Sequence, residues 1–496
     1  MPTRQDQLHS HQFTVRRVVS ALVAHDTDPP HSPFARSAGA TLAGLLIAAI
    51  VVGAASVYGM TSGRQRVDWR DSGAVLVERE SGARYVYREQ RLHPVRNYTS
   101  ALLIAGAVPP RTVLVPRAAL RGVPRGGPLG IPDAPDALPA ASDLVDGPWT
   151  VCSQSDAVRP ATAPATAPAT ASATAPATAS ATAPATAPAT GSGAGSSGAA
   201  SSVLLVGATV SGGSPLDPAG LLAQHPDGGL QLIWQGHRHP IRQPELVLDA
   251  LGWSHHRPEP IAAALLAALP AGAALNRPAV PGAGRRSLGV PQATVGEVFV
   301  VSTQGGSRQY AVALRDGLAG ITQVQADLLL TAFDQETPTV LAQGRFRALP
   351  QVPDLIPQGL GAPPAVTPSL ARPRTGTVCL RAVDPETPVR IDVDSALRRP
   401  AVSDPTVLPG RAGASVGEVD QVLVPPGQAA VVQPVDTSGV DGPVTLVTDA
   451  GRRYEMTDPA LLPLLGYPGV IPTRLPTAMV ALVRPGPLLD RAAAGG

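Results

Sequence analysis

The sequence contains no lysine, because all 39 of its basic residues are arginine. A phosphate-binding loop of the form G-x-x-x-x-G-K-[ST] needs a lysine that reaches the phosphates, and this motif is therefore absent. The arginines are dispersed and the formal net charge is only +2, so no nucleic-acid-binding surface is indicated. The sequence thus lacks the familiar form of ATP site and gives no sign of a nucleic-acid partner.

Aromatic residues are also scarce, at 3% of 496 residues, whereas 55 prolines and 50 glycines exceed average usage. The core must therefore be built from Val, Leu, Ile and Ala, in short elements that Pro- and Gly-containing turns separate. The length is enough for several domains. We expect an α+β fold.

A long charge-free run lies near the N-terminus, between Arg36 and Arg64. As a helix, residues 39–60 would rise about 33 Å, which is enough to cross a hydrocarbon core of about 30 Å. A cleaved signal peptide is one alternative, favoured by the small residues 54–56, although 36 residues precede the run. A buried helix of a soluble domain is another. We expect a single membrane anchor at 37–63.

The charges around this run indicate its orientation only weakly, since arginines stand on both sides: Arg4, Arg16, Arg17 and Arg36 before it, and Arg64, Arg66 and Arg70 after it. Both cysteines, Cys152 and Cys379, follow the run, and a disulfide would need an oxidising compartment. We therefore expect residues 1–36 in the cytoplasm and residues 64–496 outside it.

The segment before the anchor has its own pattern. Residues 13–24, FTVRRVVSALVA, predict an amphipathic helix that ends before the prolines at 29–30. Such a short helix is marginal alone in water, so its apolar face should be covered. A protein partner and the inner membrane surface are the two candidates for that cover. The face consists of Val15, Val18, Val19 and Leu22.

Several motif matches lack the structural context that their chemistry requires. Residues 160–190 repeat Pro-Ala-Thr and predict a linker, in which the Gly193-x-Gly195-x-x-Gly198 pattern has neither a strand before it nor a helix after it. Ser415, in GASVG, is expected in a loop rather than at a nucleophile elbow. No Cys or acidic cluster completes a metal site around the histidine pairs at 237/239 and 255/256, so we expect these to be ordinary surface histidines.

Self-comparison finds four versions of one unit, in which a strand, a tight turn and a second strand precede a Leu/Ala-rich helix. The second strand carries Arg84-Tyr85, Arg238-His239, Arg308 with Tyr310, or Arg453-Tyr454. A hairpin with one short helix cannot bury its apolar face alone, so the units should dock. Coincidental similarity from biased composition is the alternative. The units cover residues 76–106, 231–253, 300–330 and 445–467.

Further segments indicate a shared β-rich body between these units. Residues 112–138 and 377–400 are strand-rich, and residues 273–301 resemble 396–424 through Arg-Pro-Ala-Val and Val-Gly-Glu-Val. One Asn-x-Thr sequon occurs, at Asn97, which more readily caps a helix that begins near residue 99. Without a pocket signature, this architecture indicates a scaffold.

The chain is similar to the EccB family, a membrane component of the type VII (ESX) secretion system. The resemblance rests on residues 4–28 before a single span, then 70–78, 91–104, 125–138 and 149–152 (RQDQLHSHQFTVRRVVSALVAHDTD, RDSGAVLVE, RLHPVRNYTSALLI, RGGPLGIPDAPDAL and WTVC). The order of these motifs around one span makes the resemblance specific. The Pro-Ala-Thr insertion departs from the family pattern.

The resemblance implies an elongated extracytoplasmic region, with four small β-hairpin/helix repeats around a central β-rich domain that a Cys152–Cys379 disulfide closes. The expected domain boundaries are 1–36 cytoplasmic segment, 37–63 transmembrane helix, 64–108 first repeat, 109–155 central domain, 156–202 linker, 203–272 second repeat, 273–350 third repeat, 351–430 central domain again, 431–475 fourth repeat and 476–496 flexible tail.

The resemblance also implies partners: the EccC, EccD and EccE subunits in an oligomeric complex of the lipid bilayer, near the mycosin protease. The helical face at 15–22 would dock on EccC or EccD. Some family members carry an ATPase label, but no residues here support one, so we expect no catalytic residue, metal or cofactor, with ATP suggested by the label alone. The alternative function is an extracytoplasmic nucleotide or cell-wall hydrolase.

Overall fold

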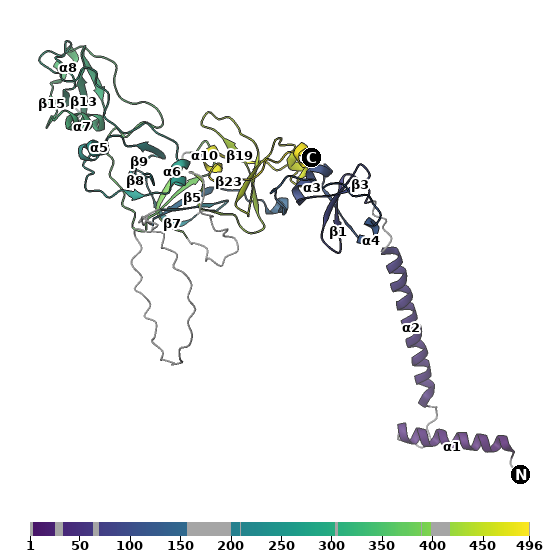
Figure 1. The fold of residues 1–496 in the computed structure, drawn as a ribbon. Helices are drawn as coiled ribbons and strands as arrows, with labels where there is room; N and C mark the ends of the chain where they lie inside the picture. The colour runs from purple at the N-terminus through teal and green to yellow at the C-terminus, as the bar shows by residue number, and fades with distance from the viewer. Residues whose placement is uncertain are drawn as a thin grey trace, which may run out of the picture. The chain divides into compact units, whose positions relative to one another are not determined.

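The computed structural model describes residues 3–24, 33–62, 69–155, 200–208, 210–302, 306–387, 389–397 and 417–495. The fold is mixed α+β, as predicted, with two compact units, residues 1–70 and 71–496 (Figure 1). The predictions for the Pro-Ala-Thr repeat, for the glycine pattern at 193–198 and for Ser415 lie outside the described residues.

The first unit contains two helices, α1 (Arg4–Ala24) and α2 (Pro33–Ser62). Helix α1 begins nine residues before the predicted start at residue 13. Asp6 explains this start, because its carboxylate accepts hydrogen bonds from the backbone N–H of Thr3 (3.1 Å) and from the Thr3 hydroxyl (2.6 Å). A carboxylate at this position satisfies a free N–H of the first turn, and the polar residues 4–12 carry no apolar periodicity that could reveal it.

The second unit begins with a four-stranded sheet in the order β3-β2-β1-β4. Strands β1, β2 and β3 form an antiparallel meander, and β4 returns parallel to β1 after helix α3. Asn97 caps α3 by accepting a hydrogen bond from the N–H of Ser100, which confirms the predicted role. The elements are β1 (Ala74–Glu78), β2 (Arg84–Arg88), β3 (Arg91–Pro94), α3 (Tyr98–Ala105), β4 (Arg111–Val115) and α4 (Arg117–Leu120).

Two further sheets follow the same path, in the orders β10-β9-β8-β11 and β14-β13-β12-β15. Their elements are β8 (Leu221–Gln224), β9 (Leu230–Trp234), β10 (His237–Pro240), α5 (Pro244–Ala250), β11 (Glu259–Pro260) and α6 (Ala263–Ala268), then β12 (Val298–Ser302), β13 (Arg308–Ala313), β14 (Leu318–Ile321), α7 (Gln323–Ala332), β15 (Thr339–Val340) and α8 (Gln343–Ala348).

The last sheet in the chain repeats the path and adds an edge strand, in the order β22-β19-β20-β21-β23. Strands β19, β20 and β21 form the meander, and β22 returns parallel to β19. Its elements are β19 (Ala429–Val435), β20 (Thr445–Thr448), β21 (Arg452–Glu455), α9 (Leu461–Leu464), β22 (Thr473–Pro476), α10 (Thr477–Val480), β23 (Arg484–Pro485) and α11 (Arg491–Gly495).

A six-stranded sheet in the order β18-β6-β5-β16-β17-β7 gathers strands from distant parts of the chain. A short 3-10 helix, η1 (Ala141–Asp143), precedes it. Its strands are β5 (Trp149–Gln154), β6 (Ser201–Leu205), β7 (Ser211–Pro215), β16 (Thr377–Ala382), β17 (Arg390–Ala396) and β18 (Gln421–Leu423).

The four similar sheets are larger than the predicted hairpin, and the Arg-Tyr motifs do not share one strand. Arg84 and Arg308 lie in the second strand of their sheets, whereas Arg238 and Arg453 lie in the third. Side chains alternate in the same way in the second and the third strand. A two-residue motif therefore could not show in which of the two strands it lies.

Two other segments also differ from expectation. Residues 112–138 were predicted in the central body, whereas β4 pairs with β1 of the first sheet. Of the similar segments 273–301 and 396–424, the first leads into β12 of the third sheet and the second into β18 of the six-stranded sheet. The Arg-Pro-Ala-Val of the second segment lies outside the described residues, and the described parts of the two Val-Gly-Glu-Val motifs lead into strands of different sheets.

Candidate functional site

Helix α2 carries the longest apolar surface in the described part of the chain. The window Gly39–Ser56 has a mean hydropathy of 2.0, and none of it is buried. Eighteen helical residues rise about 27 Å, which is close to the thickness of a hydrocarbon core. Exposing such a surface to water is unfavourable. The window is therefore a candidate membrane span, and it is not a core helix of the described fold.

The apolar face predicted before the span lies on α1. Val15, Val18 and Leu22 are 48%, 52% and 74% exposed, and Val19 is half-buried. Their spacing places them along one side of the helix. In the described part of the chain, this face is thus available for contact with another surface.

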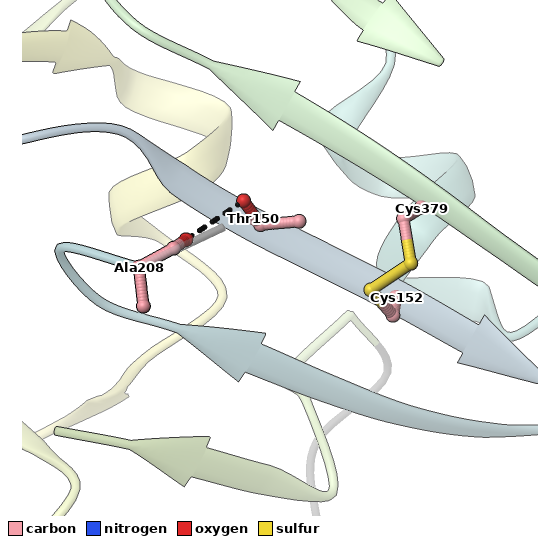
Figure 2. The surroundings of a disulfide bond; sticks show 4 residues. All are labelled: Thr150, Cys152, Ala208 and Cys379. Carbon is pink, nitrogen blue, oxygen red and sulfur yellow. Dashed lines mark hydrogen bonds between the residues drawn. A yellow bond between two sulfur atoms is a disulfide. The ribbon is translucent and has the colours of Figure 1, made fainter. Parts of the chain in front are cut away.

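The disulfide joins Cys152 in β5 to Cys379 in β16, as expected. The two residues are direct partners in the antiparallel pairing of these strands, with Cα atoms 4.0 Å apart. Figure 2 shows the bond between the neighbouring strands, and it also shows the Thr150 hydroxyl donating to the Ala208 carbonyl (3.0 Å). The bond closes a separation of 227 residues, so it ties the chain before the predicted linker to the chain well after it.

The expectation of surface histidines is wrong for His239, which is fully buried because its ring packs within the fold. The ring of His239 packs on Gly272, where a Cβ atom would clash, and His239 Nδ1 lies 2.9 Å from the carbonyl oxygen of Ala273. Burial lowers the pKa of His239 below its ordinary value, which keeps the ring neutral. Among the residues that the structure describes, no group of three or more His, Cys, Asp or Glu side chains could hold a metal ion.

Sequence reasoning missed that this ring-on-glycine contact recurs. In three of the four similar sheets, a ring from the third strand covers a glycine of a later segment, and the only sequence signal was an aromatic or histidine in that strand. The pairs are His93 with Gly126, His239 with Gly272, and Tyr454 with Gly486.

A cavity of about 700 Å³ lies where the second sheet, residues 356–365 and the fourth sheet meet, and it includes Trp234, His239 and Leu360 in its lining. Its carboxylates are engaged. Glu386 accepts from Arg474 (3.1 Å), and Asp436 accepts from the N–H groups of Ser438 and Val440 (both 2.9 Å). Both of these carboxylates are therefore held in place by hydrogen bonds.

Comparisons with known proteins agree with this picture. A family model described as "Type VII secretion system ESX-1, transport TM domain B" matches residues 1–495. The chain is 30% identical to the "ESX-2 secretion system ATPase EccB2" of Mycobacterium tuberculosis (strain H37Rv) over 513 residues, covering 99% of this chain and 94% of the relative. It is also 30% identical to the "ESX-3 secretion system ATPase EccB3" of Mycolicibacterium smegmatis, covering 65% of this chain and 56% of that relative.

Two solved structures share the fold. A chain in an intact ESX-5 inner membrane complex has a TM-score of 0.58 and 25% identity, covering 100% of this chain and 95% of the other. An EccB3 dimer from the ESX-3 core complex has a TM-score of 0.58 and 26% identity, covering 85% and 100%.

The apolar helix and the sheets together define a β-rich protein with one candidate membrane anchor in its described part. The family match over residues 1–495 makes the assignment specific. The chain belongs to the EccB family of type VII secretion systems.

Proposed function

We propose that this chain is a structural subunit of a type VII secretion membrane complex and scaffolds protein export across the cytoplasmic membrane. The observation that carries the proposal is the uncovered apolar window of α2, in a chain whose second unit is built from five sheets. The similar chain in the ESX-5 structure belongs to an inner membrane complex, which supports the same setting.

We propose further that the four similar sheets are repeat units around the six-stranded sheet, in an elongated region. Their common strand path supports this. The packing of the second and fourth sheets supports it as well, because one hydrophobic cluster joins residues of these two sheets to residues of the six-stranded sheet.

In the proposed topology, residues 1–36 lie in the cytoplasm and residues 64–496 lie outside it. The position of both disulfide cysteines after α2 supports this orientation. A reporter enzyme that works only outside the cytoplasm should be active when fused after Asp71 and inactive when fused before Arg36. The reverse pattern, or a mature N-terminus near residue 56, would contradict the topology.

The proposed partners are EccC-, EccD- and EccE-type subunits, with the mycosin protease nearby and the lipid bilayer around the anchor. We propose that the α1 face formed by Val15, Val18, Val19 and Leu22 docks on one of these subunits. The exposure of this face supports docking of some kind. The competing assignment is a helix that lies on the inner membrane surface.

Changing Val18 and Leu22 together to Asp tests this docking. The variant should stay in the membrane through α2 but be lost from the co-purified complex. Gln5→Asp/Gln12→Asp is a matched control, because it adds the same charge to exposed polar positions of α1. If the Val18/Leu22 variant assembles as well as this control, the α1 face does not bind a partner.

The same proposal assigns no catalytic role and no nucleotide cofactor to this chain. The word ATPase occurs in the names of relatives, but the sequence has no phosphate-binding loop and no lysine.

The direct test is purification from membranes through a tag on the full chain. Other secretion subunits should be recovered with it, and deletion of its gene should stop export. Recovery of the chain alone, with export unchanged in the deletion strain, would contradict the scaffold function.

A further inference from the structure

The first sheet carries an excess of positive charge. Residues 69–125 hold ten arginines and four acidic residues, a formal charge of +6, whereas the whole chain carries +2. Three of these arginines form ion pairs, namely Arg84, Arg111 and Arg117. In the described part of the chain, five more are exposed and have no hydrogen bond or ion pair through their guanidinium groups: Arg79, Arg88, Arg91, Arg96 and Arg121. The carboxylates of the sheet therefore leave much of its positive charge free.

Two of the free arginines lie at one end of the sheet. The antiparallel register pairs Val75 of β1 with Val86 of β2, and Arg88 with Arg91 across the turn between β2 and β3. That turn therefore lies beside the start of β1 at Ala74. Because the chain reaches Ala74 from α2, Arg88 and Arg91 lie at the end of the sheet that is nearest to the candidate span along the chain.

A hollow of about 850 Å³ opens at this end of the sheet. Arg88 of β2 and Arg491 of α11 both line it, and the Arg491 guanidinium also has no hydrogen bond or ion pair in the described part of the chain. One carboxylate shares the lining and is already engaged. Asp490 accepts hydrogen bonds from the N–H of Ala493 (2.8 Å) and from the Thr457 hydroxyl (3.3 Å). Two guanidinium groups without a partner thus share one hollow.

The other charged groups at this end do not cancel these arginines. Asp71 is paired, because its carboxylate accepts a hydrogen bond from the Arg111 guanidinium (3.0 Å). Glu89, in the turn between β2 and β3, is exposed and has no partner among the residues that the structure describes. Arg91 lies across the same turn and is equally free. Three free guanidinium groups at this end therefore outnumber one free carboxylate.

The lining suits a phosphate group on an apolar carrier. A guanidinium group presents several N–H donors in a plane that matches the oxygens of a phosphate, and such charge-assisted hydrogen bonds are among the strong ones. The rest of the lining includes Tyr87, Ile104, Ala105 and Ala492, which offer aromatic and apolar surface. A phospholipid combines a phosphate with apolar acyl chains and so has both features.

The chain also limits how far this hollow can lie from a membrane that α2 spans. Ser72 in the lining is ten residues after Ser62, where α2 ends, and an extended chain of that length spans at most about 36 Å. Trp69 lies in this connection, with the Arg70 guanidinium 5.2 Å from the centre of its ring, and tryptophan favours the membrane–water interface. Lipid headgroups at this end of α2 are therefore within reach of the hollow.

We propose that the end of the first sheet that carries Arg88 and Arg91 binds the phosphate of an anionic phospholipid, in the leaflet from which α2 leads to β1. Arg88 and Arg491 hold the phosphate in the hollow, and Arg91 adds positive charge beside them. Each arginine near an anionic surface strengthens binding by about fivefold, so an anionic lipid is favoured over a zwitterionic one. The inference rests on α2 as the proposed anchor and goes beyond the scaffold role by naming a lipid ligand.

The test reconstitutes the full chain in nanodiscs of phosphatidylcholine, with or without phosphatidylglycerol. A fluorescent dye is attached at Ala493→Cys, an exposed position beside the hollow, and the native cysteines do not react because they form the disulfide. A trace of phosphatidylcholine with a nitroxide on its headgroup quenches the dye when headgroups come close. Arg88→Gln/Arg491→Gln removes the two phosphate ligands. Arg79→Gln/Arg121→Gln is the matched control, because these two free arginines lie at the opposite end of the sheet.

Phosphatidylglycerol should increase the quenching in the labelled parent chain and in the control. Arg88→Gln/Arg491→Gln should lower the ratio of lipid-bound to unbound chain by about 25-fold. Arg88→Gln alone, which leaves Arg491 packed beside Gly106, should lower it by about fivefold. Equal quenching in both kinds of nanodisc, or an effect of phosphatidylglycerol that survives in Arg88→Gln/Arg491→Gln, would overturn the site.

Inorganic phosphate, added to nanodiscs of phosphatidylcholine alone, distinguishes a free phosphate from a headgroup. If it changes the dye emission through Arg88 and Arg491 while phosphatidylglycerol leaves the quenching unchanged, the hollow takes free phosphate and the lipid assignment is wrong. Failure of the chain to enter nanodiscs at all would overturn α2 as the anchor, and the proposed function with it. Entry without any effect of phosphatidylglycerol would overturn this inference alone.

Discussion

The first and fourth sheets are joined quite differently from the second and third, although all four follow the same strand path. One hydrophobic cluster contains buried residues of both the first and the fourth sheet, such as Val75 and Leu103 with Leu446 and Leu462. The third sheet contributes only Val324 and Leu328 to the cluster that it shares with the second.

The last described residues of the chain reinforce the contact between the first and fourth sheets. Helix α11 packs against α3, with Ala494 buried (Figure 1). The Arg491 side chain occupies the space where a Cβ atom on Gly106 would stand. Sheets of the same topology can therefore differ in rigidity, because the apolar area buried between two sheets decides how firmly they are held together.

Removal of the disulfide should have the largest effect, since it would weaken the sheet whose core reaches both the second and the fourth sheet. Cys152→Ser/Cys379→Ser should lower the free energy of unfolding by about 5 kcal/mol in the chain-entropy treatment, for a separation of 227 residues. Urea denaturation of the full chain measures this. Unchanged stability, or two free thiols in a non-reducing mass spectrum of the native chain, would count against it.

Two matched side-chain truncations distinguish the contact between the first and fourth sheets from the contact between the second and third. Leu103→Ala should lower the free energy of unfolding of the first and fourth sheets together by about 3 kcal/mol, because Leu103 is fully buried in their shared core. Leu328→Ala should release the third sheet from the second. Hydrogen exchange resolves the two outcomes, and a Leu103→Ala effect confined to the first sheet would show that the core is not shared.

A smaller effect is expected from Tyr467→Phe. The buried Tyr467 hydroxyl donates to the carbonyl of Pro139 (3.0 Å), which links the fourth sheet to the segment after the first. Loss of this part-buried bond should cost about 1 kcal/mol. If Leu103→Ala has already separated the two sheets, Tyr467→Phe should cause no further loss in the free energy of unfolding. A double-mutant cycle measures this coupling.

The smallest effect concerns the start of α7. The Thr322 hydroxyl accepts from the N–H of Gln325 (3.1 Å), and the Gln325 side chain accepts from the N–H of Thr322 (2.9 Å). Thr322→Ala should cost about 1 kcal/mol. Exchange should rise in α7 and at the second–third junction, while α3 and α9 stay protected. An equal rise in hydrogen exchange at the first–fourth contact and at the second–third contact would contradict the contrast between them.

Sequence patterns predicted the elements that local chemistry controls. The charge-free run predicted α2, and the Asn97 cap predicted the start of α3, because both depend on neighbouring residues. Three repeated signals, a strand, a tight turn and a helix, also located each of the four similar sheets.

The patterns could not predict which strands pair over long distances. Strand β4 pairs with β1 in a parallel ladder, and β18 pairs with β6 across more than two hundred residues. Short apolar strands fit either position, and tertiary packing selects between them. The difference between the first–fourth and the second–third contacts could not be predicted for the same reason, since it depends on how α3 meets α9 and how α5 meets α7.

The role proposed for this chain is to hold other secretion subunits in place. The most direct measurement is ATP turnover by the purified full chain with Mg·ATP, because relatives bear the ATPase name. Turnover should equal the buffer background, since the phosphate-binding loop and its lysine are missing. Repeated turnover that a single substitution abolishes, for example Glu386→Gln in the cavity beside the second sheet, would contradict the account.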